Sequence, residues 1–277
     1  MVIVVGHTGR VGKFLYDAYK AAGFKVIGID RRFEYSLDNA ALINGLLDTG
    51  PHCVVYTALS GERPYTALQS ERDLHALACF LEWVQRLHTR PSLVFLSSIS
   101  VYENLPSGLT DTGIKLACES PYAQMKLDSE RLITAARSSF ESVRILRCGA
   151  LLVHPSVDES FLGSLILNLR NQQVCELKNK HNRFNALITV ADLFRILVNP
   201  AVMPSHENTV ALLNIGSTEP LSMGEVAENA AKALRVANCV TWSRNENLPE
   251  RILEYPTRLA SHLPTVRQSL RNYISKF

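Results

Sequence analysis

Tyr122 and Lys126 are four residues apart, the spacing that places two side chains one turn apart on the same face of a helix. A lysine ammonium beside a tyrosine stabilises the phenolate, and it lowers the pKa of the phenol from its ordinary value of about 10. A tyrosine held in this way acts as a general base toward an alcohol. The pair therefore predicts proton transfer at a substrate hydroxyl. The same lysine is placed to hold the ribose of a nicotinamide cofactor.

The same spacing occurs at Tyr16 and Lys20, so the spacing alone does not select the pair that does chemistry. Ser98 makes the selection, because it follows an apolar strand predicted over 93–96 and precedes a helix predicted over 122–136 by one loop. Ligands of parallel α/β sheets gather at the carboxyl ends of the strands, where Ser98 is expected. We therefore predict Ser98, Tyr122 and Lys126 as the catalytic residues, with Ser98 donating a hydrogen bond to the substrate oxygen.

Three glycines, Gly6, Gly9 and Gly12, lie at the junction of a β-branched strand over 2–5 and a helix predicted over 11–22. Glycines at such a junction permit a tight turn, the approach of a pyrophosphate to the backbone, and close packing of the helix on the strand. The first turn of the helix then offers N–H groups and a positive dipole to phosphates. The loop predicts dinucleotide binding.

Asp30 closes a second strand predicted over 24–29. A carboxylate at this place accepts hydrogen bonds from the adenosine ribose and repels a 2′-phosphate, so the sequence predicts NAD as the cofactor. Arg31 keeps NADP possible, since an arginine next to the ribose accommodates the 2′-phosphate.

These residues need a scaffold that brings strand ends and helix starts together. Strands predicted over 2–5, 24–29, 53–57, 93–96 and 143–146 alternate with helices predicted over 11–22, 40–47, 68–87 and 122–136. This rhythm predicts an α/β fold, a Rossmann-type doubly wound parallel sheet. We predict a dinucleotide-binding domain over 1–150, with returns at about 186–216. A small C-terminal substrate-binding lobe is predicted over 151–185 and 217–277.

The segment from Phe95 to Tyr102, FLSSISVY, resembles the serine-bearing strand end of the extended short-chain dehydrogenase/reductase family, whose members include NAD-dependent sugar epimerases, dehydratases and reductases. In that family the catalytic Ser or Thr stands four residues before a Val-Tyr tyrosine, which selects Ser98 over Ser97. Other landmarks fall in the family's order: the glycine loop, Val54–Ala58, Glu119–Glu130, Arg147, Ile188–Asp192 and Asn214–Gly216. The resemblance covers about the whole chain and is strongest over 1–155.

The resemblance implies an enzyme that moves a hydride between nicotinamide and a sugar-like substrate, as an epimerase or as a reductase. The dinucleotide contacts that it and the glycine loop imply are Gly6, Thr8, Gly9, Arg10, Val11, Gly12, Asp30, Arg31, Ala58, Tyr122 and Lys126. The substrate contacts that we expect are Ser98, Ser100, His154 and Arg183. A regulatory protein of the same fold, which binds NAD(P) without chemistry, is the alternative.

Departures from the family pattern limit the substrate. Asn185 stands where members that bind nucleotide sugars often carry an arginine, and His154-Pro155 stands where they carry Gly-Pro. Both weaken the expectation of a UDP- or dTDP-sugar. Sugar 4,6-dehydratases carry Asp-Glu after the catalytic Thr, whereas this chain has Ile99-Ser100, so dehydration is disfavoured.

The amino-acid composition limits the classes of partner that we expect for this chain. The 29 Lys and Arg residues are mixed with 26 Asp and Glu residues to a net charge of +3, without a basic stripe that would indicate nucleic acid. The six cysteines lack a zinc-ligand spacing, so we expect no metal site. We expect them to be the reduced thiols of a cytoplasmic protein. No apolar stretch approaches the length of a membrane span. The helices over 68–87 and 122–136 carry wide apolar faces, and the resemblance implies that they form a homodimer.

Overall fold

The computed structural model describes residues 1–30, 50–58, 64–105, 108–110, 112–113, 116–153, 161–200, 209–243 and 250–276. The chain forms two compact units. The first comprises Met1–Asn104, Lys115–Arg147 and Met203–Leu213, and the second comprises Leu105–Ile114, Cys148–Val202 and Asn214–Phe277. Of the segment 186–216, which the sequence assigned to the first domain, the part up to 202 groups with the second unit, and 203–213 groups with the first.

A six-stranded parallel sheet organises the first unit, in the order β11-β6-β4-β3-β1-β2. Its strands are β1 (Val2–Val5), β2 (Val26–Ile29), β3 (Cys53–Tyr56), β4 (Ser92–Ser98), β6 (Val143–Cys148) and β11 (Val210–Ile215). All four residues of β1 are buried, as its uninterrupted β-branched sequence indicates for a strand covered on both faces. The sheet confirms the predicted Rossmann-type fold.

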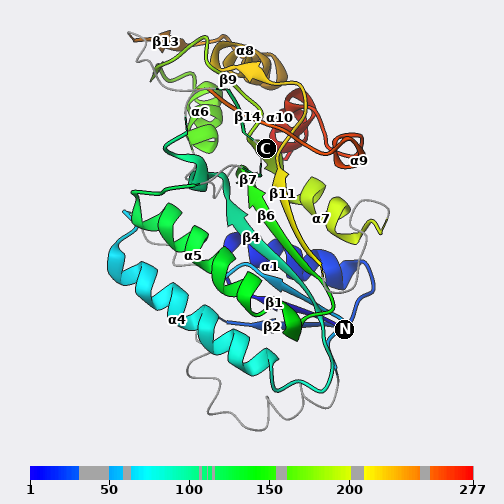
Figure 1. Ribbon diagram of the computed structural model, residues 1–277. Helices are drawn as coiled ribbons and strands as arrows, with labels where there is room; N and C mark the ends of the chain where they lie inside the picture. Colours follow the sequence, from blue (N-terminus) through cyan, green and yellow to red (C-terminus); the bar gives the residue numbers. More distant parts are fainter. Residues whose placement is uncertain are drawn as a thin grey trace. The chain divides into compact units, whose positions relative to one another are not determined.

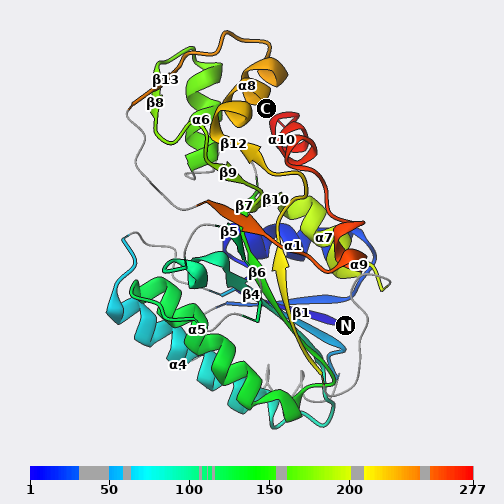
Figure 2. The ribbon, with the colours of Figure 1, turned by 45° about the horizontal axis from the view of Figure 1, so that its top comes forward.

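Helices cover both faces of this sheet. Figures 1 and 2 show α4 (Ala67–Val84) and α5 (Pro121–Ala135) side by side on one face and α1 (Arg10–Ala21) on the other. All three begin within one residue of the predicted positions, whereas the helix predicted over 40–47 lies outside the described residues. The core between α4, α5 and the sheet includes Trp83, Phe80 and Phe95, each at most 2% exposed.

The strand order reverses between β1 and β3. β1 is parallel to β2 on one side, where Val2 pairs with Val26, and to β3 on the other, where Val2 pairs with Cys53. From β3 the sheet continues to β4, with Val54 paired to Leu93. The loops that leave β1 and β3 therefore diverge, and such a switch point is where open α/β sheets bind ligands.

The second unit combines short sheets with helices. Its strands are β5 (Gly108–Thr110), β7 (Ala150–Leu152), β8 (Cys175–Leu177), β9 (Arg183–Phe184), β10 (Leu187–Thr189), β12 (Leu221–Ser222), β13 (Val240–Trp242) and β14 (Arg251–Leu253). Its helices are α6 (Phe161–Arg170), α7 (Val190–Val198), α8 (Met223–Leu234), α9 (Thr257–Ala260) and α10 (Val266–Ile274). A capping box starts α8, because Ser222 and Glu225 bond reciprocally.

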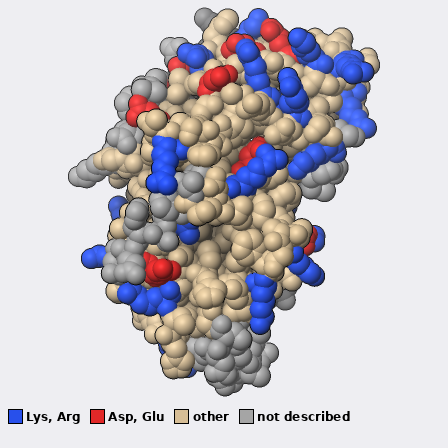
Figure 3. Space-filling model, turned by 90° about the vertical axis from the view of Figure 1, so that its right-hand side faces the viewer, with Lys and Arg blue, Asp and Glu red and all other residues tan. Residues whose placement is uncertain are grey.

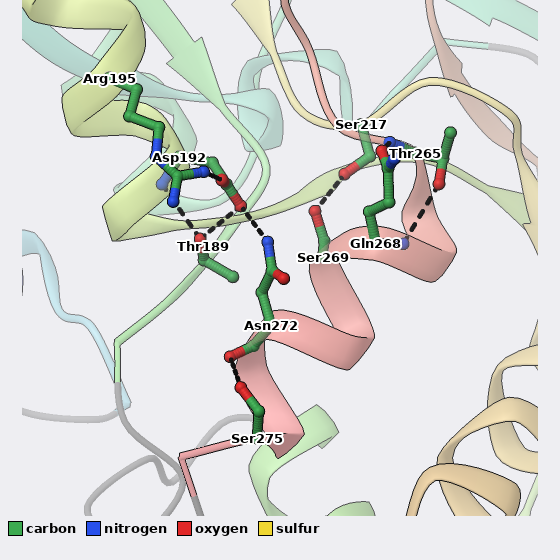
Figure 4. Close-up of polar contacts among 9 residues, drawn as sticks. All are labelled: Thr189, Asp192, Arg195, Ser217, Thr265, Gln268, Ser269, Asn272 and Ser275. Atoms are coloured by element: carbon green, nitrogen blue, oxygen red, sulfur yellow. Dashed lines mark hydrogen bonds and ion pairs between the residues drawn. The ribbon is translucent and has the colours of Figure 1, made fainter.

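Asp192 links two helices of the second unit (Figure 4). Its carboxylate accepts hydrogen bonds from Thr189 Oγ1 at 2.6 Å, from Arg195 at 2.6 Å and from Asn272 of α10 at 3.4 Å. Asp192, Arg195 and Asn272 also line a hollow of about 340 Å³. Because the buried carboxylate is fully hydrogen-bonded within the unit, we interpret the cluster as structural.

Charge is mixed on the face of the molecule that Figure 3 shows. Figure 3 shows Lys and Arg side chains as separate groups within uncharged surface, with Asp and Glu among them. Within the described residues, no helix has the length and apolar character needed to cross a membrane.

Candidate functional site

The glycine loop is packed so tightly that side chains are excluded at two positions. Gly6 has φ of +87°, and a Cβ there would lie 2.7 Å from the backbone of Ala58, after β3. A Cβ on Gly12 would lie 2.1 Å from the carbonyl oxygen of Gly6 and 2.6 Å from the hydroxyl of Thr57. The loop, the start of α1 and the end of β3 are therefore in direct contact.

The start of α1 has the features of a phosphate site. Its N-cap is Gly9, which has no side chain to bond the N–H groups of the first turn, and no acidic residue lies in that turn. Thr8, Gly9 and Arg10 are exposed, so this end of the helix is open to solvent. Bare glycine backbone beside a helix start fits the pyrophosphate of a dinucleotide. The residues present therefore fit the predicted cofactor.

Asp30 lies beside this loop. The N–H of Gly6 donates to the carbonyl of Ile29 at 2.7 Å, which ties the loop to the end of β2 immediately before Asp30. Asp30 follows directly, and its ribose contact stays a prediction, whereas Arg31 lies outside the described residues.

A contact between the loop and β2 was not predicted from the sequence. A Cβ on Gly28 would lie 2.4 Å from the imidazole of His7, whose ring is also 5.6 Å from that of Tyr16. Gly28 makes room for a histidine in the loop. Two residues so far apart give no local signal of the pairing.

Ser98 ends β4 and is the N-cap of a 3₁₀ turn, η1 (Ile99–Tyr102). Its hydroxyl oxygen accepts from the N–H of Ser100 at 3.1 Å, and the hydroxyl donates to the hydroxyl oxygen of Ser100, also at 3.1 Å between the two oxygens. The turn fixes the orientation of Ser98 at the carboxyl end of the strand, as predicted. Ser100 therefore orients the Ser98 hydroxyl through these two hydrogen bonds.

Tyr122 lies in the first turn of α5, and Lys126 lies one turn later. The Lys126 ammonium is 5% exposed and donates to the carbonyl of Leu96 at 2.8 Å, two residues before Ser98. It also lies 4.9 Å from the centre of the Phe95 ring. This contact holds the face of α5 that carries Tyr122 and Lys126 against the end of β4, so the three predicted residues lie in one region.

A second tyrosine contacts Tyr122. The ring of Tyr65 meets it edge to face, with centres 5.4 Å apart, and the Tyr65 hydroxyl donates to Asp73 at 2.6 Å. Tyr65 follows the loop after β3 and forms a wall beside the predicted base. Tyr65 is not among the residues predicted from the sequence, since nothing local distinguishes it from the other tyrosines.

A buried ion pair lies beneath these residues. Arg147 of β6 donates to both carboxylate oxygens of Glu130 on α5, at 3.0 and 2.7 Å, and the two residues are 3% and 5% exposed. Ser97 also donates to Glu130 at 2.6 Å, and Arg147 donates to the Tyr102 hydroxyl at 3.0 Å. Burial lowers the pKa of Arg147, but the bonds and charge of Glu130 outweigh this and raise it, so the arginine stays charged.

The structure does not place the predicted substrate residues Arg183 and His154 with Ser98 and Lys126. Arg183 lies on β9 of the second unit, exposed, and donates to the carbonyl of Pro220 at 3.3 Å. His154 lies outside the described residues. Asn185 is 2% exposed and exchanges hydrogen bonds with the backbone of Leu253 at 3.0 and 2.8 Å. It therefore joins strand segments, and its amide is occupied by structure.

Comparison with known proteins identifies the family. The sequence profile of the NAD dependent epimerase/dehydratase family matches residues 2–216. The chain belongs to this family. This confirms the resemblance inferred from the motifs. None of the curated proteins compared with the sequence matches it.

Solved structures share the fold of this family member. MoeE5 in complex with UDP-glucuronic acid and NAD is 21% identical with a TM-score of 0.76, the match covering 99% of this chain and 98% of that one. UDP-glucose 4-epimerase from Brucella ovis in complex with NAD is 17% identical with a TM-score of 0.77, at 99% and 95% coverage. RMD from Pseudomonas aeruginosa complexed with NADPH is 20% identical with a TM-score of 0.74, at 99% and 98% coverage.

Removing one member of the buried ion pair is predicted to destabilise the fold strongly. Arg147→Met leaves the Glu130 carboxylate unpaired in the core, so the free energy of unfolding should fall by about 3–5 kcal/mol. The control is Arg131→Ala, which removes an exposed ion pair with Asp128 on the same helix and should cost at most about 1 kcal/mol. Urea unfolding monitored by circular dichroism measures both. Equal losses would show that the buried pair does not support the site.

Proposed function

We propose that this chain is an NAD-dependent oxidoreductase or epimerase that acts on a hydroxyl or keto group of a sugar-like substrate through Ser98, Tyr122 and Lys126. The observation that carries the proposal is the contact of the Lys126 ammonium with the Leu96 carbonyl. It fixes the turn of α5 that follows Tyr122 against the strand end that bears Ser98. Family membership supports the same reaction class.

Each side chain has a separate role. The Ser98 hydroxyl donates a hydrogen bond to the substrate oxygen. Tyr122 removes the proton from the substrate hydroxyl. Lys126 has two protons left after its bond to Leu96, and these stabilise the phenolate and hold the nicotinamide ribose. NAD supplies a hydride acceptor when bound. Return of the hydride to the opposite face of a keto intermediate would make the chain an epimerase, and a single transfer would make it a reductase.

We propose a sugar nucleotide or a related sugar as the substrate. The structures of MoeE5 and of the Brucella ovis epimerase support this class through their fold and their named ligands or substrate. Asn185 stands where family members that bind nucleotide sugars often carry an arginine, and its amide is hydrogen-bonded to Leu253. This argues that other residues bind the substrate in this chain. Arg183, Ser100 and His154 remain predicted substrate contacts. Ile99-Ser100 after Ser98 argues against 4,6-dehydration.

Tyr122→Phe is predicted to abolish turnover while the Kd for NAD changes by only a few-fold, because it deletes the base and keeps the ribose contact of Lys126. Lys126→Ala should reduce both. Cofactor absorbance during incubation with UDP-sugars and free sugars measures net oxidation or reduction, chromatography of the sugars measures epimerisation, which leaves NAD unchanged overall, and calorimetry measures binding. Substantial turnover by Tyr122→Phe would contradict the assignment of the base. Binding of NAD by the wild type without turnover of any sugar would favour a regulatory protein.

Asp30 is predicted to set the choice of cofactor. Asp30→Ala should weaken NAD binding and improve the affinity for NADP relative to NAD, since the carboxylate no longer repels the 2′-phosphate. Titration of both dinucleotides into wild type and variant tests this, with Asp17→Ala as a control on the exposed face of α1. Preference of the wild type for NADP would overturn the assignment.

A homodimer remains our proposal for the assembly. Much of the apolar surface that suggested it is buried within the chain, including Leu77, Leu81 and Trp83 of α4 and Met125 of α5. Leu68 of α4 and Leu132 of α5 stay 55% and 38% exposed. The apolar area left for a partner is therefore smaller than the sequence indicates.

Light scattering is predicted to give the mass of two chains at micromolar concentration. Leu132→Glu should shift the mass toward one chain by placing a charge in the apolar contact. Glu82→Gln, on an exposed position of α4, is the control and should leave the mass unchanged. A wild-type mass of one chain at every concentration would contradict the dimer.

The cytoplasmic location of the chain likewise remains a prediction.

A further inference from the structure

Glu103 joins the two segments that carry the proposed catalytic groups. It is the C-cap of η1, the turn that begins after Ser98, and so lies five residues beyond Ser98. Its side chain reaches the start of α5. One carboxylate oxygen accepts from the N–H of Glu119 at 2.6 Å and from the N–H of Ser120 at 2.8 Å. The other accepts from the Ser120 hydroxyl at 2.6 Å.

Ser120 passes this contact on to the helix. It is the N-cap of α5, and its hydroxyl oxygen accepts from the N–H of Ala123 at 3.3 Å while its proton goes to Glu103. Tyr122 lies between Ser120 and Ala123, so the capped turn contains the proposed base. A carboxylate at this end of the helix also interacts favourably with the helix dipole.

The three bonds are stronger than a chance surface contact. Partial burial raises the pKa of Glu103, but the bonds from the Ser120 hydroxyl, the Ser120 N–H and the Glu119 N–H outweigh it and lower the pKa below its ordinary value. The carboxylate is therefore charged at neutral pH, and the bonds are charge-assisted. Glu103 and Glu119 are sixteen positions apart, and their contact closes the segment between them together with the bonds of Asn104 to the Ala117 carbonyl and of Cys118 to the Val101 carbonyl.

We propose that Glu103 is a positioning residue, which fixes the Tyr122 turn of α5 relative to Ser98 through its bonds to Glu119 and Ser120. This inference rests on the proposed function of Tyr122 and Ser98. Lys126 anchors the same helix one turn further on through Leu96, so the two contacts hold the base from both sides. Loss of the Glu103 contact should misplace the phenol without removing any group that touches the cofactor.

Two variants separate the hydrogen bonds from the charge. Glu103→Ala deletes all three bonds. Glu103→Gln keeps an oxygen that accepts both N–H groups, and its amide can donate to the Ser120 hydroxyl oxygen, so the contact persists without charge. Glu119→Ala is the matched control, because it removes a neighbouring exposed carboxylate and keeps the backbone N–H that donates to Glu103.

Hydrogen exchange of the full chain, read by mass spectrometry, tests the contact without any assay of activity. Exchange in the peptide spanning 118–125 should be faster in Glu103→Ala, and unchanged in Glu103→Gln and Glu119→Ala. Unchanged exchange in Glu103→Ala would overturn the proposal. Thermal unfolding of the three variants verifies that each is folded under the conditions used.

Turnover of a UDP-sugar found in the wild-type panel then tests the positioning role. In Glu103→Ala, kcat should fall by about tenfold to a hundredfold while KM and the Kd for NAD stay within about threefold. Glu103→Gln should restore most of kcat. Faster exchange with unchanged kcat, or equal losses in the alanine and glutamine variants, would overturn the positioning role. Absence of turnover by the wild type would instead overturn the proposed function, and exchange would still decide whether the contact exists.

Discussion

The buried pair between Glu130 and Arg147 is the interaction on which the rest of the first unit depends. It joins α5 to β6 across the core, and Ser97 brings in the end of β4. Two charges that are almost inaccessible to water need each other, because either alone would bear an uncompensated desolvation cost of several kcal/mol. The pair therefore allows one relative placement of helix and strands. That placement is the one that presents Ser98 at the strand end.

A single face of α5 combines stability with proposed chemistry. Tyr122, Lys126 and Glu130 are spaced four residues apart and so lie on one side of the helix. Glu130 is fixed in the core, Lys126 is fixed on the Leu96 carbonyl, and Tyr122 lies in the first turn. Because Lys126 and Glu130 are held by charge-assisted bonds, the position of the Tyr122 phenol on the same helix is fixed. At the outer end, the Glu103 carboxylate meets the backbone before Tyr122.

The cofactor end follows from a different constraint, the exclusion of side chains. Gly12 lies against the carbonyl of Gly6, and Gly6 lies against Ala58, so bare backbone lines the point where the strand order reverses. Gly28 gives the His7 ring its space in the same way. The two regions are thus built oppositely: backbone approaches backbone closely at the glycine loop, and paired charges lie under α5, the helix that carries the proposed base.

Local patterns in the sequence determined the elements and the order of the motifs. The β-branched run before Gly6, the helical periodicity around Lys126 and the strand before Ser98 depend on neighbours in the chain, so they predicted the parallel sheet and its helices. The contacts that hold the site join distant residues. Glu130 and Arg147 are seventeen residues apart and belong to different elements, and Glu103 meets Ser120 across a loop. Such pairs have no periodicity to reveal them, because they exist only after the sheet and helices have packed.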